Sequence, residues 1–559
     1  MRQLLVCVAL ATALPHAQPA RRPLGAADID AIVRLLALED ARQFDEPTLT
    51  RLLRSSHPEV RRRTVIAIAR IANQNGGALL TDLRRDPDPE IVATVAFAAG
   101  QLKDPGSVAW LAQVLTDPST SPSIAQEAAR SLGKIRTPDA RAGLVKYLSG
   151  APSASAPSAV VGEALLSIGR FTERGDLAPI VRWSTSADVE VRWRTAWALF
   201  RPRDPAALPH SLRLADDPSP LVRLWAMRGL ARQIVTEAGG DSAKVSARLR
   251  DAVRDVDRQV RTEALRTLVG YDDDASMTAV LAALDSNDTW LSVSAAEGLG
   301  QLKGGPDQIA RIVPRLVAAA AVTRPLALRI TILEALATLA PGPAADLAYA
   351  LGREKSVVAR ATAMQLLPKL GAAGKVKLDE LSQDSTLKDL PPTTAPARAT
   401  PAKRAEADYR RIAERLIVAD YNGAEKPKAT LTTPRGEIDV ELYAGDAPLG
   451  VMHFIALVES GAMLGTEFGR VVPNFVAQQR PIRDAVTLRD EVSRRGLTRA
   501  NVSWASAGLD TGRPGYTFGV TPQPHNEGDF TALGRVIRGM DAVDRLERGD
   551  AILAARMIK

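Results

Sequence analysis

The sequence predicts a multidomain protein in which a long solenoid of paired helices precedes a smaller, strand-rich domain. Its 559 residues exceed what one hydrophobic core requires. One helical phrase recurs between residues 28 and 372, and a Pro-, Ala- and Thr-rich stretch at 390–407 interrupts it. Alternating strand patterns begin near Pro427. We therefore divide the chain into an N-terminal segment (1–20), a repeat array (28–372), a linker with a short helix (373–426) and a C-terminal domain (427–559).

The N-terminal segment has the layout of a secretory signal peptide. In "MRQLLVCVALATALPHAQPARR" a basic Arg2 precedes an apolar stretch at 4–14 and small residues up to position 20. Cys7, the chain's single cysteine, lies inside it, so the mature protein would contain no thiol. No later stretch reaches about 18 uninterrupted apolar residues. The sequence predicts a secreted or bacterial periplasmic protein without an integral membrane segment after cleavage; the alternative is a buried first helix.

The repeated phrase is an acidic or proline-containing turn, an aliphatic residue, often an arginine, and then alanines and leucines at helical spacing. It is seen in "HPEVRRRTVIAIARI" (57–71), "DPEIVATVAFAAGQL" (88–102) and "PSPLVRLWAMRGLA" (218–231). Val60 and Ile91 are 31 residues apart, as are Val260 and Leu291. Such a period indicates stacked two-helix units that bury their apolar faces only against neighbours. The pattern resembles HEAT repeats, in about nine copies, and the resemblance implies a curved surface for other proteins.

Two residue types in the repeats invite a functional interpretation but favour a structural one. An arginine follows the aliphatic position in several copies and is expected to pair with an acidic turn residue of the same or the next repeat: Arg61, Arg192, Arg223 and Arg261. Tryptophans cluster in the middle copies, and most should be core, although one exposed indole would anchor a partner: Trp183, Trp193, Trp197 and Trp225.

Charge and composition exclude several function classes. The net charge of +8 comes from 72 basic and 64 acidic residues without a run of five or six like charges, so no nucleic-acid partner is expected. The five histidines show no metal-ligand spacing, and a phosphate-binding G-x-x-x-x-G-K-[ST] loop is absent from the sequence. We expect neither a metal nor a cofactor.

The C-terminal domain opens with strand signals. "KATLTTPRGEIDVELY" reads as two strands around a turn at 434–436, and "DAPLGVMHFIALVESGAM" as a helix with Pro448 in its first turn and Gly461 at its end. The stretch "GTEFGRVVPNFVAQQRP" (465–481) then places two hydrophobic strand segments around a Pro473-Asn474 turn.

With the later "WASAGLDTGRPGYTFGVTPQPHNEGDFTALGRVIRGMDAVDRL", this order resembles the cyclophilin family of peptidyl-prolyl isomerases over residues 427–550. The resemblance implies a cyclophilin-like closed β-barrel of eight strands with two capping helices and a proline pocket on one face. It implies Arg470 as the catalytic residue. The implied substrate-binding positions are Phe468, Phe475, Val476, Gln478, Ser506, Gly515, Thr517, His525 and Phe530.

Several of these positions depart from the family pattern. Gly469 replaces the histidine of F-H-R, Val476 a methionine and Ser506 an asparagine. Gly515 takes the place of a substrate-binding glutamine, and Thr517 that of a pocket phenylalanine. We therefore expect weak affinity for short peptides, and we expect Gly515→Gln with Thr517→Phe to raise activity if the backbone there follows the family.

The chemistry implied requires no nucleophile or metal. Rotation about an X-Pro bond is slow because amide resonance must be broken. A catalyst needs to grip the proline ring and donate a hydrogen bond that favours the twisted nitrogen. Phe475 would form the pocket floor, Gln478 would hold the peptide backbone, and Arg470 would supply the permanent positive charge.

The sequence thus predicts an exported peptidyl-prolyl cis-trans isomerase acting in protein folding, with proline-containing polypeptides as clients and the array binding other proteins. Two alternatives remain open: a chaperone or scaffold whose barrel binds peptide without turnover, and a structural assembly factor. The composition break also predicts that the barrel folds alone and that its activity is independent of the array.

Overall fold

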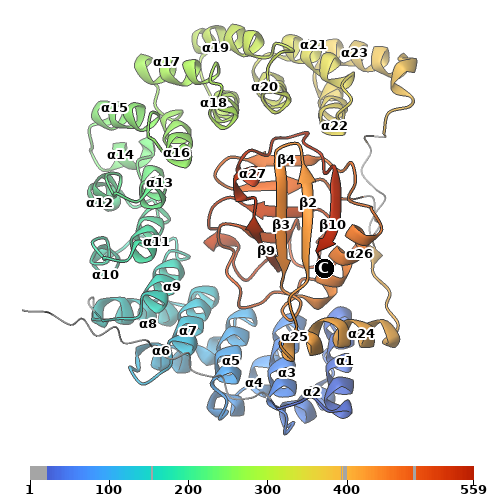
Figure 1. The fold of residues 1–559 in the computed structure, drawn as a ribbon. Helices are drawn as coiled ribbons and strands as arrows, with labels where there is room; N and C mark the ends of the chain where they lie inside the picture. Colours follow the sequence, from blue (N-terminus) through green and yellow to red (C-terminus); the bar gives the residue numbers. More distant parts are fainter. Residues whose placement is uncertain (1–21, 153–154, 392, 394–399, 483–485, 559) are drawn as a thin grey trace, which may run out of the picture.

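The computed structural model describes residues 22–152, 155–391, 393, 400–482 and 486–558, so the predicted signal peptide lies outside the described residues. A helical array curves around a barrel, which occupies its hollow (Figure 1). The predicted fold class, an all-α solenoid followed by a β-barrel, is confirmed, and the barrel is a curled antiparallel sheet.

The array consists of helices in two rows. Their bounds are α1 (Ala26–Ala41), α2 (Glu46–Leu53), α3 (Pro58–Ile71), α4 (Gly76–Leu79), α5 (Pro89–Gln101), α6 (Val108–Thr116), α7 (Pro122–Ile135), α8 (Pro138–Gly150), α9 (Ser158–Ile168), α10 (Ala178–Val181), α11 (Val189–Phe200), α12 (Leu208–Leu214), α13 (Pro220–Arg228), α14 (Arg232–Glu237), α15 (Ser242–Ala252), α16 (Arg258–Leu268), α17 (Asp274–Ala283), α18 (Thr289–Gln301), α19 (Pro306–Ala319), α20 (Leu326–Leu339), α21 (Pro341–Gly352), α22 (Val357–Leu366) and α23 (Gly371–Gln383).

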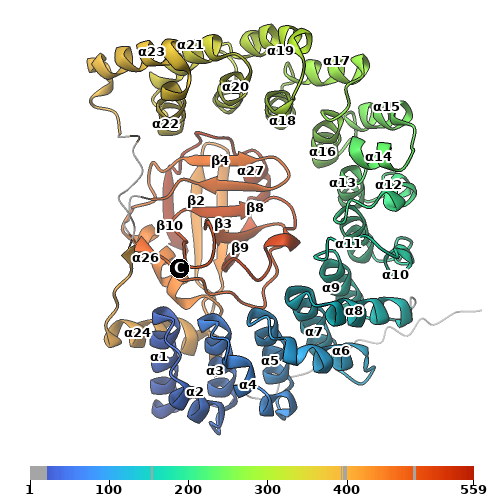
Figure 2. The same cartoon turned by 180° about the vertical axis from the view of Figure 1, so that it is seen from behind.

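The repeated phrase forms the inner row, which faces the barrel (Figure 2). Its turn residues cap these helices: the Asp88 carboxylate accepts a hydrogen bond from the Glu90 amide, and Asp188 does the same for Glu190. Small residues let neighbouring inner helices approach closely. A Cβ on Gly100 of α5 would lie 2.9 Å from the Cα of Ser131 on α7.

The arginines of the phrase connect consecutive repeats, as expected. Each guanidinium pairs with an aspartate in the turn of the next repeat, at 2.7–3.2 Å: Arg61 with Asp86, Arg192 with Asp217, Arg223 with Asp255 and Arg261 with Asp288. The four clustered tryptophans are all at most 2 % exposed, so none of them is a free anchor: Trp183, Trp193, Trp197 and Trp225. Both groups stabilise the array.

The array and its linker differ from expectation in two respects. Helix α23 continues the array beyond residue 372. The short helix of the linker, α24 (Glu406–Ile412) with a π-helical turn (Ala413–Val418) and α25 (Ala419–Tyr421), packs against α1, with the Tyr409 hydroxyl donating to Asp40 at 2.8 Å. The segment after the last repeat therefore returns to the first one.

The barrel is an eight-stranded antiparallel sheet in the order β10-β2-β3-β9-β7-β8-β5-β4. Hydrogen bonds between 465–468 and 549–552 join its two edges, for example from the Phe468 amide to the Asp550 carbonyl at 2.8 Å. The elements are β2 (Lys428–Thr433), β3 (Gly436–Leu442), α26 (Pro448–Glu459), β4 (Phe468–Val472), β5 (Val476–Gln479), β7 (Asn501–Trp504), β8 (Tyr516–Gly519), β9 (Ala532–Arg538), α27 (Met540–Asp544) and β10 (Ala554–Ile558), with a separate pair β1 (Thr400–Pro401) and β6 (Val486–Thr487).

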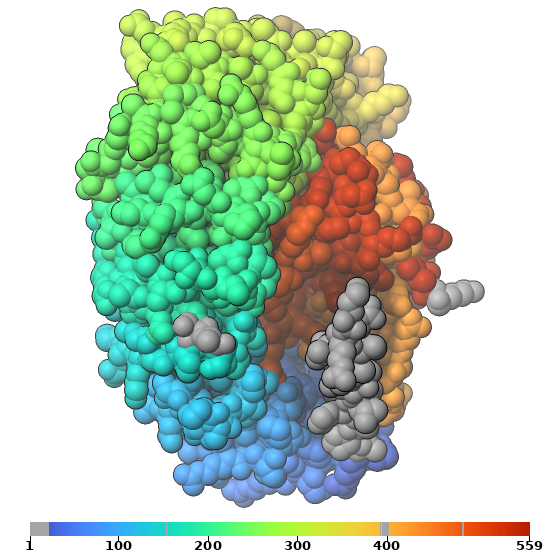
Figure 3. Space-filling model, turned by 60° about the vertical axis from the view of Figure 1, so that its left-hand side comes forward, coloured from blue at the N-terminus to red at the C-terminus, as the bar shows by residue number. Residues whose placement is uncertain are grey.

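The barrel is docked against the inner wall of the array (Figure 3). Basic side chains of the inner row donate to backbone carbonyls of the barrel. The pairs are Arg70 to Asp446 and Val492, Arg130 to Arg494, Lys134 to Gly528, Arg170 to Pro524 and Glu527, Arg258 to Asp544, and Arg266 to Pro473.

The docking also has an apolar and an acidic component. Ile32, Val33 and Trp290 of the array belong to the same buried cluster as the barrel core. From the barrel, the Glu467 carboxylate accepts hydrogen bonds at 2.8–2.9 Å from Ser356 and from the first amides of α22. The two domains therefore share an interface. We now expect the activity of the barrel to depend on the array.

Candidate active site

Arg470 of β4 and Gln478 of β5, two predicted site residues, lie next to each other on one barrel face. Arg470 and Gln478 are cross-strand partners, and the Arg470 Nη1 donates to the Gln478 Oε1 at 3.4 Å. The Pro473-Asn474 turn, with Asn474 at φ 58°, joins the two strands and leads into Phe475. The Arg470 guanidinium carbon lies 5.3 Å from the Phe475 ring centre. A cation is thus held over an aromatic ring at the edge of the sheet.

Phe475 is fixed from both sides. Its carbonyl accepts hydrogen bonds from the Val520 amide at 3.0 Å and from the Gln523 amide side chain at 3.1 Å. Its ring stacks on His525, with 5.6 Å between ring centres and 26° between planes. Gln523 was not predicted as a site residue, and only a fold that brings the loop 520–528 beside β5 reveals it.

Three further predicted residues differ in their burial. Val476 is buried, and Ser506 and Phe530 are half-buried. The Ser506 hydroxyl oxygen is buried without a hydrogen-bond partner among the described residues.

Phe468 does not join the site. Its side chain is 0 % exposed and packs near Phe518, with 6.0 Å between ring centres. Residues 468 and 470 would share a face in a regular strand, but the register between β4 and β5 shifts between them, at Gly469. This irregularity directs Phe468 to the core and leaves Arg470 exposed.

The two replaced positions, Gly515 and Thr517, are closed rather than open. Thr517 is buried beside Gln478, and its hydroxyl lies 2.6 Å from that of Ser503. A Cβ on Gly515 would lie 2.9 Å from the carbonyl oxygen of Gln479, which is backbone and has little freedom to move. A glutamine at 515 would therefore require the backbone of residues 479–481 to shift, so no gain is expected from restoring that side chain.

Electrostatics at the site are set largely by the array. Partial burial lowers the pKa of Arg470 from its ordinary 12.5, while the carboxylate of Glu297 on α18 opposes this, so the guanidinium stays charged near neutrality. Burial, together with the charges of Arg201, Arg228 and Arg170, lowers the pKa of His525 to about 4. His525 is therefore neutral at pH 7. Sequence reasoning assigned none of these array residues to the site.

The chemistry available at this face follows from the groups that the described residues place there. Among the described residues no group of three or more His, Cys, Asp or Glu side chains could hold a metal ion. Within the same residues, no helix is long and apolar enough to cross a bilayer. What the site offers is an aromatic surface, a fixed cation and an amide side chain in one cross-strand cluster.

Comparison with known proteins supports the assignment of both the helical array and the barrel. A family model described as cyclophilin type peptidyl-prolyl cis-trans isomerase/CLD matches residues 428–558, and one described as HEAT repeats matches 77–165 and 176–268. A peptidyl-prolyl cis-trans isomerase of Helicobacter pylori is 31 % identical over 143 residues, 23 % of this chain and 85 % of that protein. Peptidyl-prolyl cis-trans isomerase B of Bacillus subtilis is 31 % identical over 129 residues, 22 % of this chain and 90 % of that protein.

Among solved structures, a cyclophilin type peptidyl-prolyl cis-trans isomerase of Cryptosporidium parvum is 18 % identical, with a TM-score of 0.22, and covers 24 % of this chain and 98 % of its own. These relatives match the C-terminal quarter of the chain, and the array lies outside their similarity.

Proposed function

We propose that this chain, which belongs to the cyclophilin-type peptidyl-prolyl cis-trans isomerase family, catalyses X-Pro rotation in polypeptides outside the cytoplasm while its HEAT-repeat array holds client or partner proteins. The observation that supports catalysis is the cluster of Arg470, Phe475 and Gln478 on adjacent strands. Phe475 receives the proline ring, Gln478 orients the peptide, and Arg470 donates to the prolyl nitrogen as it loses amide character.

The proposed step moves no proton and breaks no covalent bond. The guanidinium stabilises the twisted amide more than the planar one, which lowers the barrier by differential binding. Removing one preorganised donor typically costs 10²–10³ in rate, so we expect Arg470→Ala to lower kcat/KM by about that factor.

The test is a proline-isomerisation assay on the full chain, comparing the native protein with Arg470→Ala. The matched control is Arg54→Ala, at an exposed arginine that follows α2. Circular dichroism and thermal unfolding should be unchanged in both variants. Equal rates for native protein, Arg470→Ala and the uncatalysed peptide would refute catalysis.

One observation favours the alternative of a peptide-binding scaffold or chaperone: the closed positions Gly515 and Thr517 remove side chains that grip substrate. In that case the native protein would bind proline peptides without catalysing their isomerisation, and Arg470→Ala would weaken that binding.

Export is supported only by the predicted signal segment 1–20. Fractionation of the host would test it by N-terminal sequencing of the protein. A processed N-terminus near residue 20 outside the cytoplasm is expected, and intact Met1 in the cytoplasm would contradict it.

A further inference from the structure

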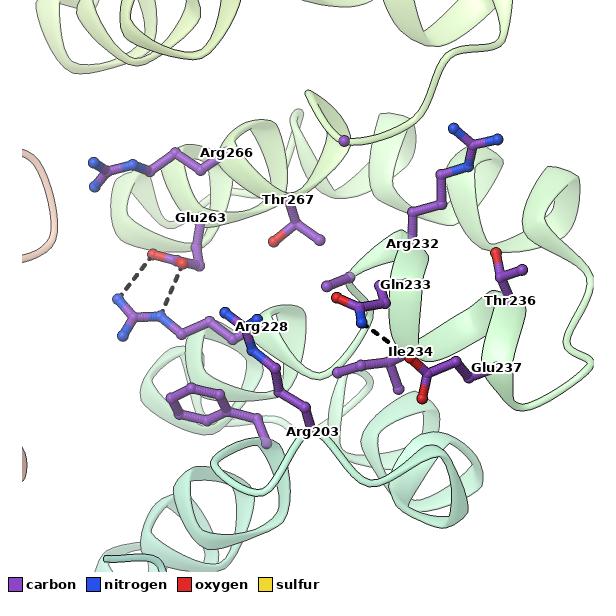
Figure 4. A pocket seen from close by; sticks show the side chains of 13 residues that line it. Arg203, Arg228, Arg232, Gln233, Ile234, Thr236, Glu237, Glu263, Arg266 and Thr267 are labelled. Carbon is purple, nitrogen blue, oxygen red and sulfur yellow. Dashed lines mark hydrogen bonds and ion pairs between the residues drawn. The ribbon is translucent and has the colours of Figure 1, made fainter. Parts of the chain in front are cut away.

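A cavity of about 820 Å³ opens in the array beside the candidate active site, between the ends of α11, α13 and α16 (Figure 4). Its size is within the range of ligand-binding pockets. Phe200 forms an apolar part of its wall, and its charged lining consists of four arginines and two glutamates: Arg203, Arg228, Arg232, Arg266, Glu237 and Glu263.

The charge of this cavity is not balanced by its own glutamates. Glu263 is satisfied by Arg228, which contacts both of its oxygens at 2.8 and 3.2 Å. Glu237 pairs with Arg174 at 2.8 Å, and Arg174 is not part of the lining. Arg232 pairs with Asp272 at 2.8 Å and Arg266 with Glu297 at 2.9 Å, and neither carboxylate belongs to the lining. Arg203 is exposed, and within the described part of the chain no hydrogen bond or ion pair engages its guanidinium group. The cavity therefore offers the unpaired positive charge of Arg203 to a ligand.

Two hydrogen bonds connect the lining of the cavity to the barrel residues next to the candidate site. Arg266 donates to the Pro473 carbonyl at 2.6 Å, and the Asn474 amide donates to Glu263 at 3.1 Å. These two barrel residues directly precede Phe475, the proposed pocket floor. Arg228, a third lining residue, lies close enough to act on the charge state of His525, which stacks on Phe475.

A peptide whose proline lies on Phe475 therefore has one neighbouring wall that belongs to the array and carries arginines. Because Arg470 and Arg203 are exposed, the face is open despite the docking. Carboxylates are the client side chains that such a wall recognises best, since guanidinium groups bind them with paired hydrogen bonds.

Resting on the proposed isomerase function, we propose that this arginine-lined cavity is a second subsite, which binds acidic side chains flanking the client's proline. It makes the array a determinant of substrate choice rather than a passive support. Its contribution acts on client binding and leaves the chemical step at Arg470 unchanged.

The test uses the full chain and three fluorescein-labelled peptides with a central Ala-Pro, flanked on each side by three Glu, three Gln or three Lys. Fluorescence anisotropy measures Kd, and isomerisation kinetics measure kcat and KM. The Glu peptide should bind about tenfold more tightly than the Lys peptide at 50 mM salt, and the ratio should shrink at 0.5 M salt.

Charge reversal at two lining arginines that donate no hydrogen bond to the barrel, Arg203→Glu with Arg232→Glu, should lower the Glu-to-Lys affinity ratio about five- to tenfold. The kcat for the Gln peptide should not change. The control Arg54→Glu reverses one arginine charge at a site outside the cavity and should leave the ratio as it is.

Three outcomes would overturn the subsite: an affinity ratio near one in the native protein, an equal effect of Arg54→Glu, or equal binding of a Glu-flanked Ala-Ala peptide. The last would show a general anion site unconnected to proline binding. Absence of turnover with a preserved, cavity-dependent affinity ratio would instead refute the isomerase function and leave the subsite standing.

Discussion

The barrel's attachment at α22 offers a sharp test of the docked arrangement through Glu467. Its carboxylate accepts from the Ser356 hydroxyl and from the amides of Val357 and Val358 at 2.8–2.9 Å. These amides start a helix and have no intrahelical acceptor, and the helix dipole adds to the attraction of a negative charge.

The magnitude follows from the number and type of these bonds. A hydrogen bond to a charged group contributes about 1.5–3 kcal/mol net, but Glu467 is only half-buried, so water partly replaces it after truncation. We therefore expect Glu467→Ala to cost about 2–3 kcal/mol for the opening of α22, which corresponds to roughly 30- to 150-fold.

Hydrogen exchange of the full chain, followed by mass spectrometry on peptides from 355–366, measures that opening directly. The control is Glu459→Ala, because this carboxylate pairs with Arg415 at 3.3 Å while both side chains are at least half exposed. Surface pairs of this kind contribute about 0–1 kcal/mol. Unchanged protection of Val357 and Val358 in Glu467→Ala would refute docking at α22.

Three other predictions concern the barrel and its dependence on the array. Gly515→Gln should destabilise the protein by about 1–3 kcal/mol in urea unfolding without raising activity, because its Cβ would meet backbone atoms. The control Gly342→Gln should be nearly neutral, because a Cβ at that position meets no atom within 4 Å. Higher activity in Gly515→Gln would contradict the geometry. NMR titration should place the pKa of His525 at about 4, mainly through burial, and Arg228→Ala should raise that pKa. Since the pKa of the unfolded chain is near 6.5, the stability from the neutral ring is present above pH 6.5 and is lost as the pH falls toward 4. A pKa near 6.5 in the native protein would refute this. Deletion of residues 189–219, one repeat, should reduce both stability and isomerase activity, and unaltered kcat/KM would show that the barrel acts without the array.

The sequence was sufficient for the fold because each level of pattern agreed with the next. The repeated phrase carries caps, an inward aliphatic position and small residues at close contacts, so its period predicts stacked helices. The barrel was predictable from its strand alternation and from family resemblance. Arg470, Phe475 and Gln478 could be named for the same reason, and the structure brings these three together.

What the sequence did not reveal depends on local geometry. Phe468 and Arg470 are two residues apart, and strand periodicity places them on one face until the irregularity at Gly469 is known. The close approach of residues 479–481 to Gly515 is likewise a property of the backbone. A residue-by-residue comparison treats Gly515 as a missing side chain, whereas the structure shows a site that the chain itself has closed.

The docked arrangement had a sequence signal that is clear only in retrospect. A basic residue recurs in or just after the last turn of inner helices, as in Arg70, Lys134, Arg170, Arg228 and Arg266. All except Arg228 donate to barrel carbonyls, and Arg228 faces His525. Carbonyl oxygens are presented by the backbone whatever the side chain, so the barrel's sequence carries no mark of this contact. The array's basic residues carry it instead, at a spacing set by the repeat, and the same row supplies Arg228 and Arg266, two of the four arginines of the proposed subsite for acidic side chains.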